Sequence, residues 1–170
     1  MILVVADTGP ICYLVLIEGA DVLSRLYDRV VLPKSVFAEL THPHAPAAVK
    51  AWVSSLPGWV EVRSASHVDL GSILGPGEAE AIALALELKA DSLLLDEAEG
   101  RDEALRLGLP VAGTVGVLEK AAERELVNLP EMFARLSRTS FHISRELLAQ
   151  ALERDAERRA RRERDRGMQR

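Results

Sequence analysis

Two aspartates follow short apolar segments, and their placement could support chemistry. Asp7 comes directly after Ile2–Ala6, and Asp96 directly after Ser92–Leu95. Such runs are typical of buried parallel strands, and sites in open parallel sheets lie outside the carboxyl ends of the strands. Two carboxylates brought together there repel each other unless a divalent cation holds them, and oxygen ligands suit Mg²⁺ or Mn²⁺. The alternative is that each aspartate only caps the next helix.

Helix geometry separates two glutamates in the helix expected to begin at Glu78. At about 100° per residue, Glu80 and Glu87 lie within about 20° of each other, and we expect this stripe to face solvent. Glu78 lies roughly 160° from it, on the face shared with Ile82 and Ala85. We therefore expect Glu78 to point inward, either towards the aspartates or simply as an acid that stabilises the helix N-terminus.

Three further acids are weaker candidates for the same site. Glu39 borders the apolar face of a short helix, where it could reach a cleft or only mark the edge of that face. Glu97 and Glu99 follow Asp96 directly, and one of them could be a further ligand while the other lies at the surface.

Two hydroxyls and one cation also lie near these acids in the sequence. Thr8 and Thr114 each follow a predicted strand, where a hydroxyl could orient a ligand carboxylate or a bound water, or could cap a helix. Arg101 could contact a substrate phosphate, or it could pair with Glu97 or Glu99.

The elements that must position these residues alternate between short apolar strands and helices. Strands are expected at 2–6, 29–32, 59–63, 92–95 and 110–112. Helices are expected at 11–17, 21–27, 33–40, around 52, at 78–89, 99–107 and after 116. This alternation predicts an α/β fold with a mostly parallel central sheet flanked by helices.

The end of the chain follows a different pattern. Beyond Ser144, a candidate N-cap, apolar residues keep a helical period, and Asp155 and Arg159 form a favourable i,i+4 pair. We expect one long charged helix that frays after about Arg164. The sequence thus divides into a main domain over 1–143, which holds the candidate acids, and a charged C-terminal helix or tail over 144–170.

Composition limits the classes of protein that fit. The chain has 170 residues, 48% of them hydrophobic, which suits a single folded domain. Its net charge is −5; residues 151–170 hold eight Arg against five acids, which leaves −8 for the other 150. The strong negative charge of these first 150 residues argues against a simple electrostatic groove for nucleic acid. No apolar run is long enough for a membrane span, and the single cysteine, Cys12, favours a reducing, cytoplasmic location.

Five motifs occur in a fixed order along the chain: Asp7-Thr-Gly-Pro10, Val36-Phe-Ala-Glu39, Gly77-Glu-Ala-Glu-Ala-Ile82, Leu94-Leu-Asp-Glu97 with Gly100-Arg101, and Gly113-Thr-Val-Gly-Val-Leu118. This ordered set resembles PIN-domain proteins, in particular the VapC-like branch and its PIN-like group with an extended C-terminus. The resemblance covers roughly residues 2–142.

The resemblance implies a metal-dependent ribonuclease that hydrolyses RNA phosphodiester bonds with one or two Mg²⁺ or Mn²⁺ ions. The acids that match the family's ligands are Asp7, Glu39, Glu78 and Asp96, with Glu97 as an auxiliary ligand. Thr8 and Thr114 match hydroxyls that support those ligands. The family usually has Asp at several of these places, so Glu80 stays open as the alternative to Glu78.

The resemblance also implies partners. Many VapC-like proteins are toxins that an antitoxin protein inhibits, and homodimers are common among them. The Arg-rich C-terminal helix could contact RNA or another subunit, or it could be a solvated helix held by salt bridges.

Other readings compete with the nuclease. A PIN fold could serve as an RNA- or partner-binding module with little turnover. A phospho-receiver domain could use Asp96 as its acceptor, with Thr114 and Lys120 nearby. A P-loop is excluded because no Gly-Lys-Ser/Thr follows the Gly-rich segment 71–77. We expect Trp52 and Trp59 to pack rather than to stack on bases, and Cys12 to be an inert buried thiol.

Overall fold

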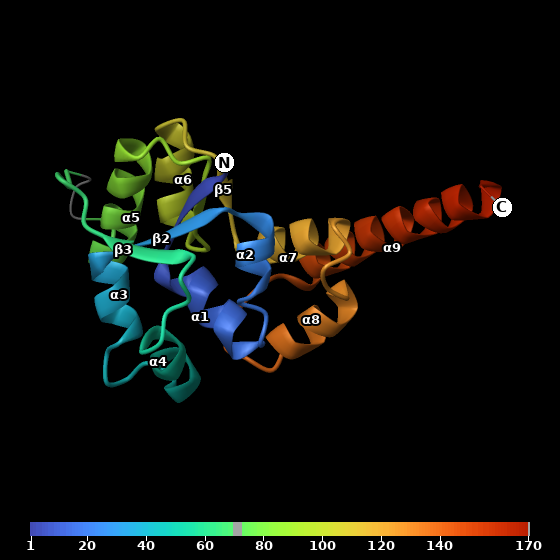
Figure 1. Cartoon of the computed structure of the whole chain (residues 1–170), viewed down its shortest axis with the longest axis horizontal. Coiled ribbons are helices and arrows are strands. Elements are labelled where there is room, and N and C mark those ends of the chain that lie inside the picture. Colours follow the sequence, from blue (N-terminus) through green and yellow to red (C-terminus); the bar gives the residue numbers. More distant parts are fainter. Residues whose placement is uncertain (70–72, 170) are drawn as a thin grey trace. The chain divides into compact units, whose positions relative to one another are not determined.

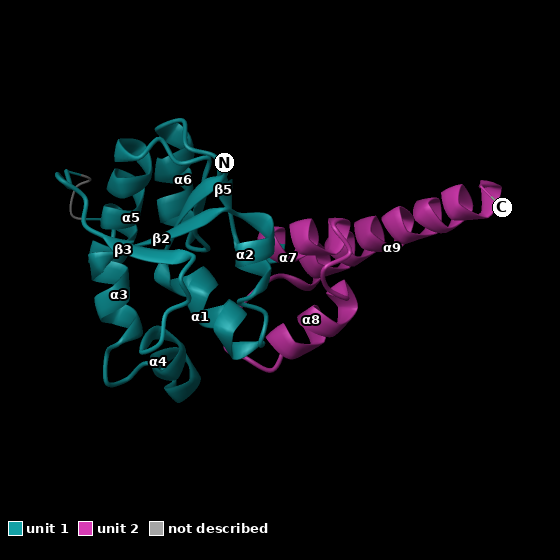
Figure 2. Ribbon diagram, viewed as in Figure 1, with its two compact units in different colours: residues 1–115 teal, residues 116–170 magenta. Residues whose placement is uncertain are grey.

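A computed structural model describes residues 1–69 and 73–169 of the chain. The first part of the Gly-rich segment, residues 70–72, lies outside the described residues. The described chain forms two compact units, residues 1–115 and 116–170 (Figure 2). The division at 143/144 expected from the sequence stays a prediction.

Unit 1 is built on a five-stranded parallel sheet with the order β3-β2-β1-β4-β5 (Figure 1). The strands are β1 (Leu3–Ala6), β2 (Arg29–Pro33), β3 (Val60–Arg63), β4 (Ser92–Leu94) and β5 (Val111–Ala112). This architecture confirms the predicted α/β class. Receiver domains have the strand order 2-1-3-4-5 instead, so the sheet does not support the phospho-receiver alternative.

The chain order of the strands reverses between β1 and β4, which are neighbours in the sheet. Ala6 of β1 pairs with Leu94 of β4 in the parallel register. In an open α/β sheet, the point where the strand order reverses leaves a crevice at the carboxyl ends of the strands. Asp7 and Asp96 follow these two strands, so the fold brings both aspartates to this crevice.

Helices connect the strands, and two of them build the core on one face of the sheet. The helices of unit 1 are α1 (Thr8–Leu16), α2 (Val22–Leu26), α3 (Lys34–Leu40), α4 (Ala47–Val53), α5 (Pro76–Glu87) and α6 (Ala98–Arg106). Residues of α5 and α6 form one hydrophobic cluster with Val5, Val31 and Leu93 of the strands. Val4 and Ala6 are buried as well. Because successive residues of a strand point to opposite faces, β1 is covered on both sides, as its unbroken apolar run predicts.

The ends of several helices follow from local sequence. Pro33 ends β2, and α3 begins at the next residue, since proline fixes its own φ and suits the start of a helix. α6 ends at Arg106, two residues before Gly108, whose φ of +80° is the left-handed conformation that glycine adopts most easily. α1 begins at Thr8, three residues earlier than expected, directly after Asp7 in an extended conformation.

Unit 2 contains most of α7 (Thr114–Glu123) together with α8 (Leu129–Leu136) and α9 (Arg145–Met168). The sequence analysis did not predict α8. Its start is nevertheless encoded, because the Asn128 side chain accepts a hydrogen bond from the Glu131 N–H and Pro130 lies in the first turn. The predicted cap of α9 is confirmed, since Ser144 Oγ accepts from the Leu147 N–H at 3.1 Å.

Arginines one turn apart on α9 pair with acids in and after α7. Arg154 pairs with Glu119 at 3.0 Å, and Arg166 pairs with Glu125 at 2.9 Å. Between them, Arg158 pairs with Glu123 at 3.5 Å. The prediction that α9 frays after Arg164 is wrong, because the pair with Glu125 holds the last turns and the helix runs to Met168.

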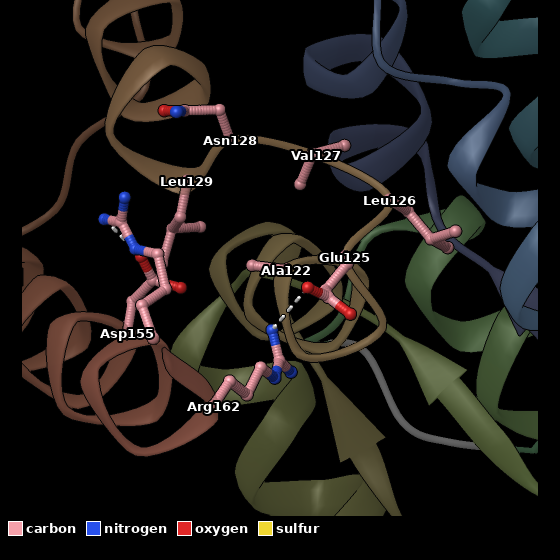
Figure 3. Close-up of a pocket in the computed structure, with 9 residues that line it drawn as sticks. Ala122, Glu125, Leu126, Val127, Asn128, Leu129, Asp155 and Arg162 are labelled. Carbon is pink, nitrogen blue, oxygen red and sulfur yellow. Dashed lines mark ion pairs between the residues drawn. The ribbon is translucent and has the colours of Figure 1, made fainter. Parts of the chain in front are cut away.

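A pocket of about 390 Å³ lies within unit 2 (Figure 3). Asp155 lines it, is only 3% exposed and forms an ion pair of 2.7 Å with Arg159, which confirms the predicted i,i+4 pair. The lining contains none of the acids predicted for catalysis. Across the described residues, no helix is long and apolar enough to span a lipid bilayer.

Candidate active site

Asp7 is the most deeply buried acid at the crevice between β1 and β4. Its side chain is 5% exposed, and its backbone N–H donates to the Leu94 carbonyl at 2.9 Å, which joins the ends of the two strands. The side chain of Asp7 makes no capping hydrogen bond to α1, although the residue stands at the N-cap position. The capping alternative is therefore not supported for Asp7.

The pKa of Asp7 shows which other acids surround it. Burial raises this pKa from its ordinary value of 3.8 to about 7; a hydrogen bond from the Thr8 backbone opposes the rise, and the charges of Glu39, Glu78 and Asp96 add to it. The other three acids predicted as ligands are therefore close enough to Asp7 to repel its carboxylate. The four acids come from four segments: the end of β1, the helices α3 and α5, and the loop after β4.

Glu39 stands at the exposed edge of this group. Its Oε2 accepts a hydrogen bond from Thr8 Oγ1, as a supporting hydroxyl would provide. The carboxylate lies directly over the backbone of α5: a Cβ at Gly77 would be only 2.5 Å from Glu39 Oε1. Since Gly77 has no side chain, the carboxylate of Glu39 can approach the start of α5 and its neighbour Glu78.

Glu78 is half-buried and faces further acids in the loop after β4. Burial raises its pKa, and the charges of Glu97, Glu39 and Glu99 raise it further. Glu97 and Glu99 are both exposed. The inward direction expected for Glu78 thus agrees with its surroundings, and Glu97 lies near enough to act with it.

Asp96 is held in place by Thr114. The Thr114 N–H donates to Asp96 Oδ1 at 2.7 Å and its hydroxyl donates to Oδ2 at 2.6 Å. Burial raises the pKa of Asp96, while the bonds from Thr114 and the charge of Arg101 act to lower it. The Arg101 guanidinium also donates to the Leu95 carbonyl at 3.2 Å, so a cation stands beside the acids.

Four glycines make room for these carboxylates, and the sequence analysis did not assign them a role. A Cβ at Gly9 would lie 3.3 Å from Asp96, one at Gly100 3.2 Å from Glu78, and one at Gly113 2.7 Å from both Asp96 and Arg101. Each distance is tighter than ordinary contact. The available signal was that the motifs of Asp7, Glu78 and Asp96 each include a glycine, whereas the motif of Glu39 does not.

The prediction that Glu80 lies on a solvent-exposed face is wrong. The side chain is 7% exposed, and its two oxygens accept from the backbone N–H groups of Ser35 at 2.7 Å and Ala65 at 3.1 Å. Burial acts to raise the pKa of Glu80, but hydrogen bonds from the side chain and backbone of Ser35 and from the backbone of Ala65, together with the charge of Lys34, bring it below its ordinary value. Both oxygens already serve backbone donors.

Two other predicted features have simpler surroundings. Trp52 and Trp59 are half-buried and contact each other, with ring centroids 6.3 Å apart, as expected for packing residues. Cys12 is half-buried rather than fully buried, and burial raises the pKa of its thiol, which disfavours the reactive thiolate.

The acids suit a hard divalent cation in their chemistry. Oxygen ligands are what Mg²⁺ and Mn²⁺ prefer, and a cation would offset both the burial and the repulsion that raise the pKa of Asp7. Among residues 1–69 and 73–169, no three His, Cys, Asp or Glu side chains are grouped closely enough to hold a metal as they stand. Binding therefore requires side chains such as Glu39 and Glu78 to turn further inward.

Comparison with known protein families agrees with this architecture. A family model, DUF3368, described as a PIN domain, matches residues 3–157. Among solved structures, the chain is similar to a PilT N-terminus domain protein, SSO1118, from the hyperthermophilic archaeon Sulfolobus solfataricus P2. That match has 19% sequence identity and a TM-score of 0.49, and it covers 84% of this chain and 100% of the other. No curated protein matches the chain. Because the family match spans most of its length, the chain belongs to the PIN-domain family.

Proposed function

We propose that this protein is a ribonuclease that depends on Mg²⁺ or Mn²⁺ and hydrolyses RNA phosphodiester bonds. PIN domains are generally nucleases, and many take part in toxin–antitoxin systems. The observation that carries the proposal is that four separate segments bring Asp7, Glu39, Glu78 and Asp96 to one crevice; burial raises the pKa of Asp7 to about 7, and the charges of the other three acids add to that rise. Perturbed acids at the crevice of an α/β sheet are typical of functional sites.

Asp7, Glu39, Glu78 and Asp96 would hold the metal, with Glu97 as an auxiliary ligand. Bound there, one or two ions would supply Lewis acidity and positive charge for phosphodiester hydrolysis. Thr8 fixes the direction of Glu39, and Thr114 fixes that of Asp96.

Arg101 is the residue that we assign to the substrate. Its guanidinium lies next to Asp96, and bidentate contact with phosphate suits arginine. It would hold a phosphate oxygen while the carboxylates hold the cation. This assignment predicts that Arg101→Ala slows RNA cleavage at least tenfold but leaves Mn²⁺ affinity unchanged.

We further propose that the protein acts in the cytoplasm as the toxin of a toxin–antitoxin pair. The body of the chain is acidic, at −8 over residues 1–150, and the candidate site exposes Glu39. A basic segment of an antitoxin would complement both. The half-buried free cysteine agrees with a reducing compartment.

RNA cleavage tests the proposal. Wild-type protein and Asp96→Asn are incubated with a mixed RNA panel in Mg²⁺, in Mn²⁺ and in EDTA. We expect cleavage by the wild type in metal, none in EDTA, and at least a hundredfold loss in the variant. Glu87→Gln, which alters an exposed acid of α5, serves as the matched control and should cleave normally.

A binding module with little turnover is the second candidate, and one observation favours it. The acids do not yet form a three-ligand metal group in the described part of the chain. RNA binding without cleavage, by protein that also binds Mn²⁺, would support this candidate over the nuclease.

A further inference from the structure

Glu80 is a buried acid that the proposed reaction does not use. It lies on α5 two residues beyond Glu78, and its two oxygens accept hydrogen bonds from Ser35 and Ala65. The two donors belong to different elements, the first turn of α3 and the segment after β3. The Glu80 side chain thus links α5 both to α3 and to the segment after β3.

The hydrogen bond to Ser35 satisfies a donor that α3 itself leaves open. The first N–H groups of an α-helix have no partner within the helix. Pro33, at the N-cap of α3, makes no side-chain capping bond, and proline has no side-chain acceptor to offer. Glu80 supplies that acceptor from the neighbouring helix, at 2.7 Å.

The same two helices meet again at the candidate active site. Glu39 on α3 lies over Gly77 on α5, where a Cβ would be 2.5 Å from Glu39 Oε1. Glu80 is three residues beyond Gly77, and Ser35 is four residues before Glu39, so the two contacts are about one helical turn apart on each helix. The pairing of Gly77 with Glu39 and of Glu80 with Ser35 means that α3 and α5 run antiparallel here.

We propose that Glu80 is a positioning residue for the metal site. Its bond to α3 fixes the register of α3 against α5 and thereby holds Glu39 beside Glu78. This inference rests on the proposed function, because it assigns Glu39 and Glu78 as ligands of one cation. Glu80 itself touches neither metal nor substrate.

Mn²⁺ affinity measured by calorimetry, well below the melting temperature, tests this role. In Glu80→Gln the amide keeps the size of the side chain but can accept at only one of its two ends. Residues that orient metal ligands typically change metal affinity 10–100-fold, so we expect at least a tenfold weaker affinity for Mn²⁺.

Glu87→Gln is the matched control. Glu87 lies on the same helix and accepts hydrogen bonds from the N–H, at 2.7 Å, and the hydroxyl of Ser66, next to the Ala65 donor rather than on α3. This variant should keep the wild-type affinity for Mn²⁺. If Glu80→Gln does not fold, Glu80→Asp, which keeps the charge but shortens the reach, replaces it.

A second measurement, on metal-free protein, separates the positioning role from the proposed function. The NMR resonances of Gly77 and of the Glu39 side chain should shift in Glu80→Gln and stay unchanged in Glu87→Gln. Wild-type protein that binds no Mn²⁺ would contradict the metal site. The resonances of Gly77 and Glu39 would then show by themselves whether Glu80 positions Glu39. A Glu80→Gln protein that loses stability but keeps its Mn²⁺ affinity and its Gly77 and Glu39 resonances would overturn the inference.

Discussion

At the scale of single residues, burial raises the pKa of Asp7 to about 7, and repulsion from the three neighbouring acids adds to that rise. Its carboxylate is buried and faces Glu39, Glu78 and Asp96, so ionising it costs free energy in the folded protein. The hydroxyls of Thr8 and Thr114 stabilise the neighbouring carboxylates instead. The cost at Asp7 is what a bound cation would offset.

Asp7→Asn should therefore stabilise the metal-free protein. Because the pKa of Asp7 is raised in the folded protein, folding favours the protonated carboxyl group. The stabilising contribution of Asp7 is therefore complete below its ordinary pKa of 3.8 and is lost as the pH rises through about 7. One pKa unit corresponds to about 1.4 kcal/mol, so at pH 8 we expect a gain of a few kcal/mol in the free energy of unfolding, measured with urea. The gain should disappear below about pH 4. A variant no more stable than wild type at pH 8 would contradict the buried, repelled carboxylate.

Gly77→Ala should damage the site while the fold survives. The added Cβ would meet Glu39 at 2.5 Å, and the flexible carboxylate must move away. Stability should change by only about 1 kcal/mol, because alanine also favours the helix. We expect Mn²⁺ affinity and RNA cleavage to fall at least tenfold. Gly58→Ala is the control, because a Cβ at this position meets nothing within 4 Å. Equal Mn²⁺ affinity and equal cleavage in the two variants would contradict the proposed role of Gly77.

At the scale of elements, the sequence predicts the individual strands and helices better than it predicts which of them lie side by side. The apolar runs of β1, β2 and β4 identify the strands because each is buried on both faces. The strand order that brings Asp7 to Asp96 depends on long-range pairing that no local pattern contains. The fold class and the four acids could therefore be predicted, with help from the family resemblance, whereas their contacts could not.

Glu80 shows the physical limit of a helical wheel. The wheel correctly places Glu80 and Glu87 on one stripe, since both bond the segment at Ala65 and Ser66. The wheel does not show what covers that stripe. We expected solvent next to Glu80, but backbone N–H groups of two other segments lie there. The start of α8 is a different case. Its capping signal at Asn128 is local and could have been used to predict the helix.

The pairing of α7 with α9 yields a prediction for the end of the chain. Glu125 pairs with Arg166 at 2.9 Å and lies 3.8 Å from Arg162. Glu125→Gln should free the last turns of α9 and speed amide hydrogen exchange over residues 162–168 several-fold. The global melting temperature should change little, because exposed ion pairs contribute about 1 kcal/mol or less. Glu163→Gln, on the exposed side of α9, should leave exchange unchanged; similar exchange in both variants would show that the pair does not hold the helix end.

At the scale of the whole molecule, a cation that binds only the folded protein must stabilise it. At a free Mn²⁺ concentration 100 times the dissociation constant, this stabilisation is about 2.7 kcal/mol. For a chain of this length that corresponds to roughly 5–10 °C in melting temperature. We expect Mn²⁺ to raise the melting temperature of the wild type by this amount, EDTA to reverse the rise, and Asp96→Asn to show none. An equal rise in Asp96→Asn would place the cation elsewhere.

The central claim is that carboxylates from four segments close around one cation site, and a crystal structure grown with Mn²⁺ tests it most directly. The anomalous signal of manganese locates the ion independently of any ligand assignment. The account predicts a peak bounded by Asp7, Glu39, Glu78 and Asp96, with Glu80 still bonded to Ser35. Saturating Mn²⁺ with no peak among these four carboxylates, or with a peak only at another place on the chain, would contradict it.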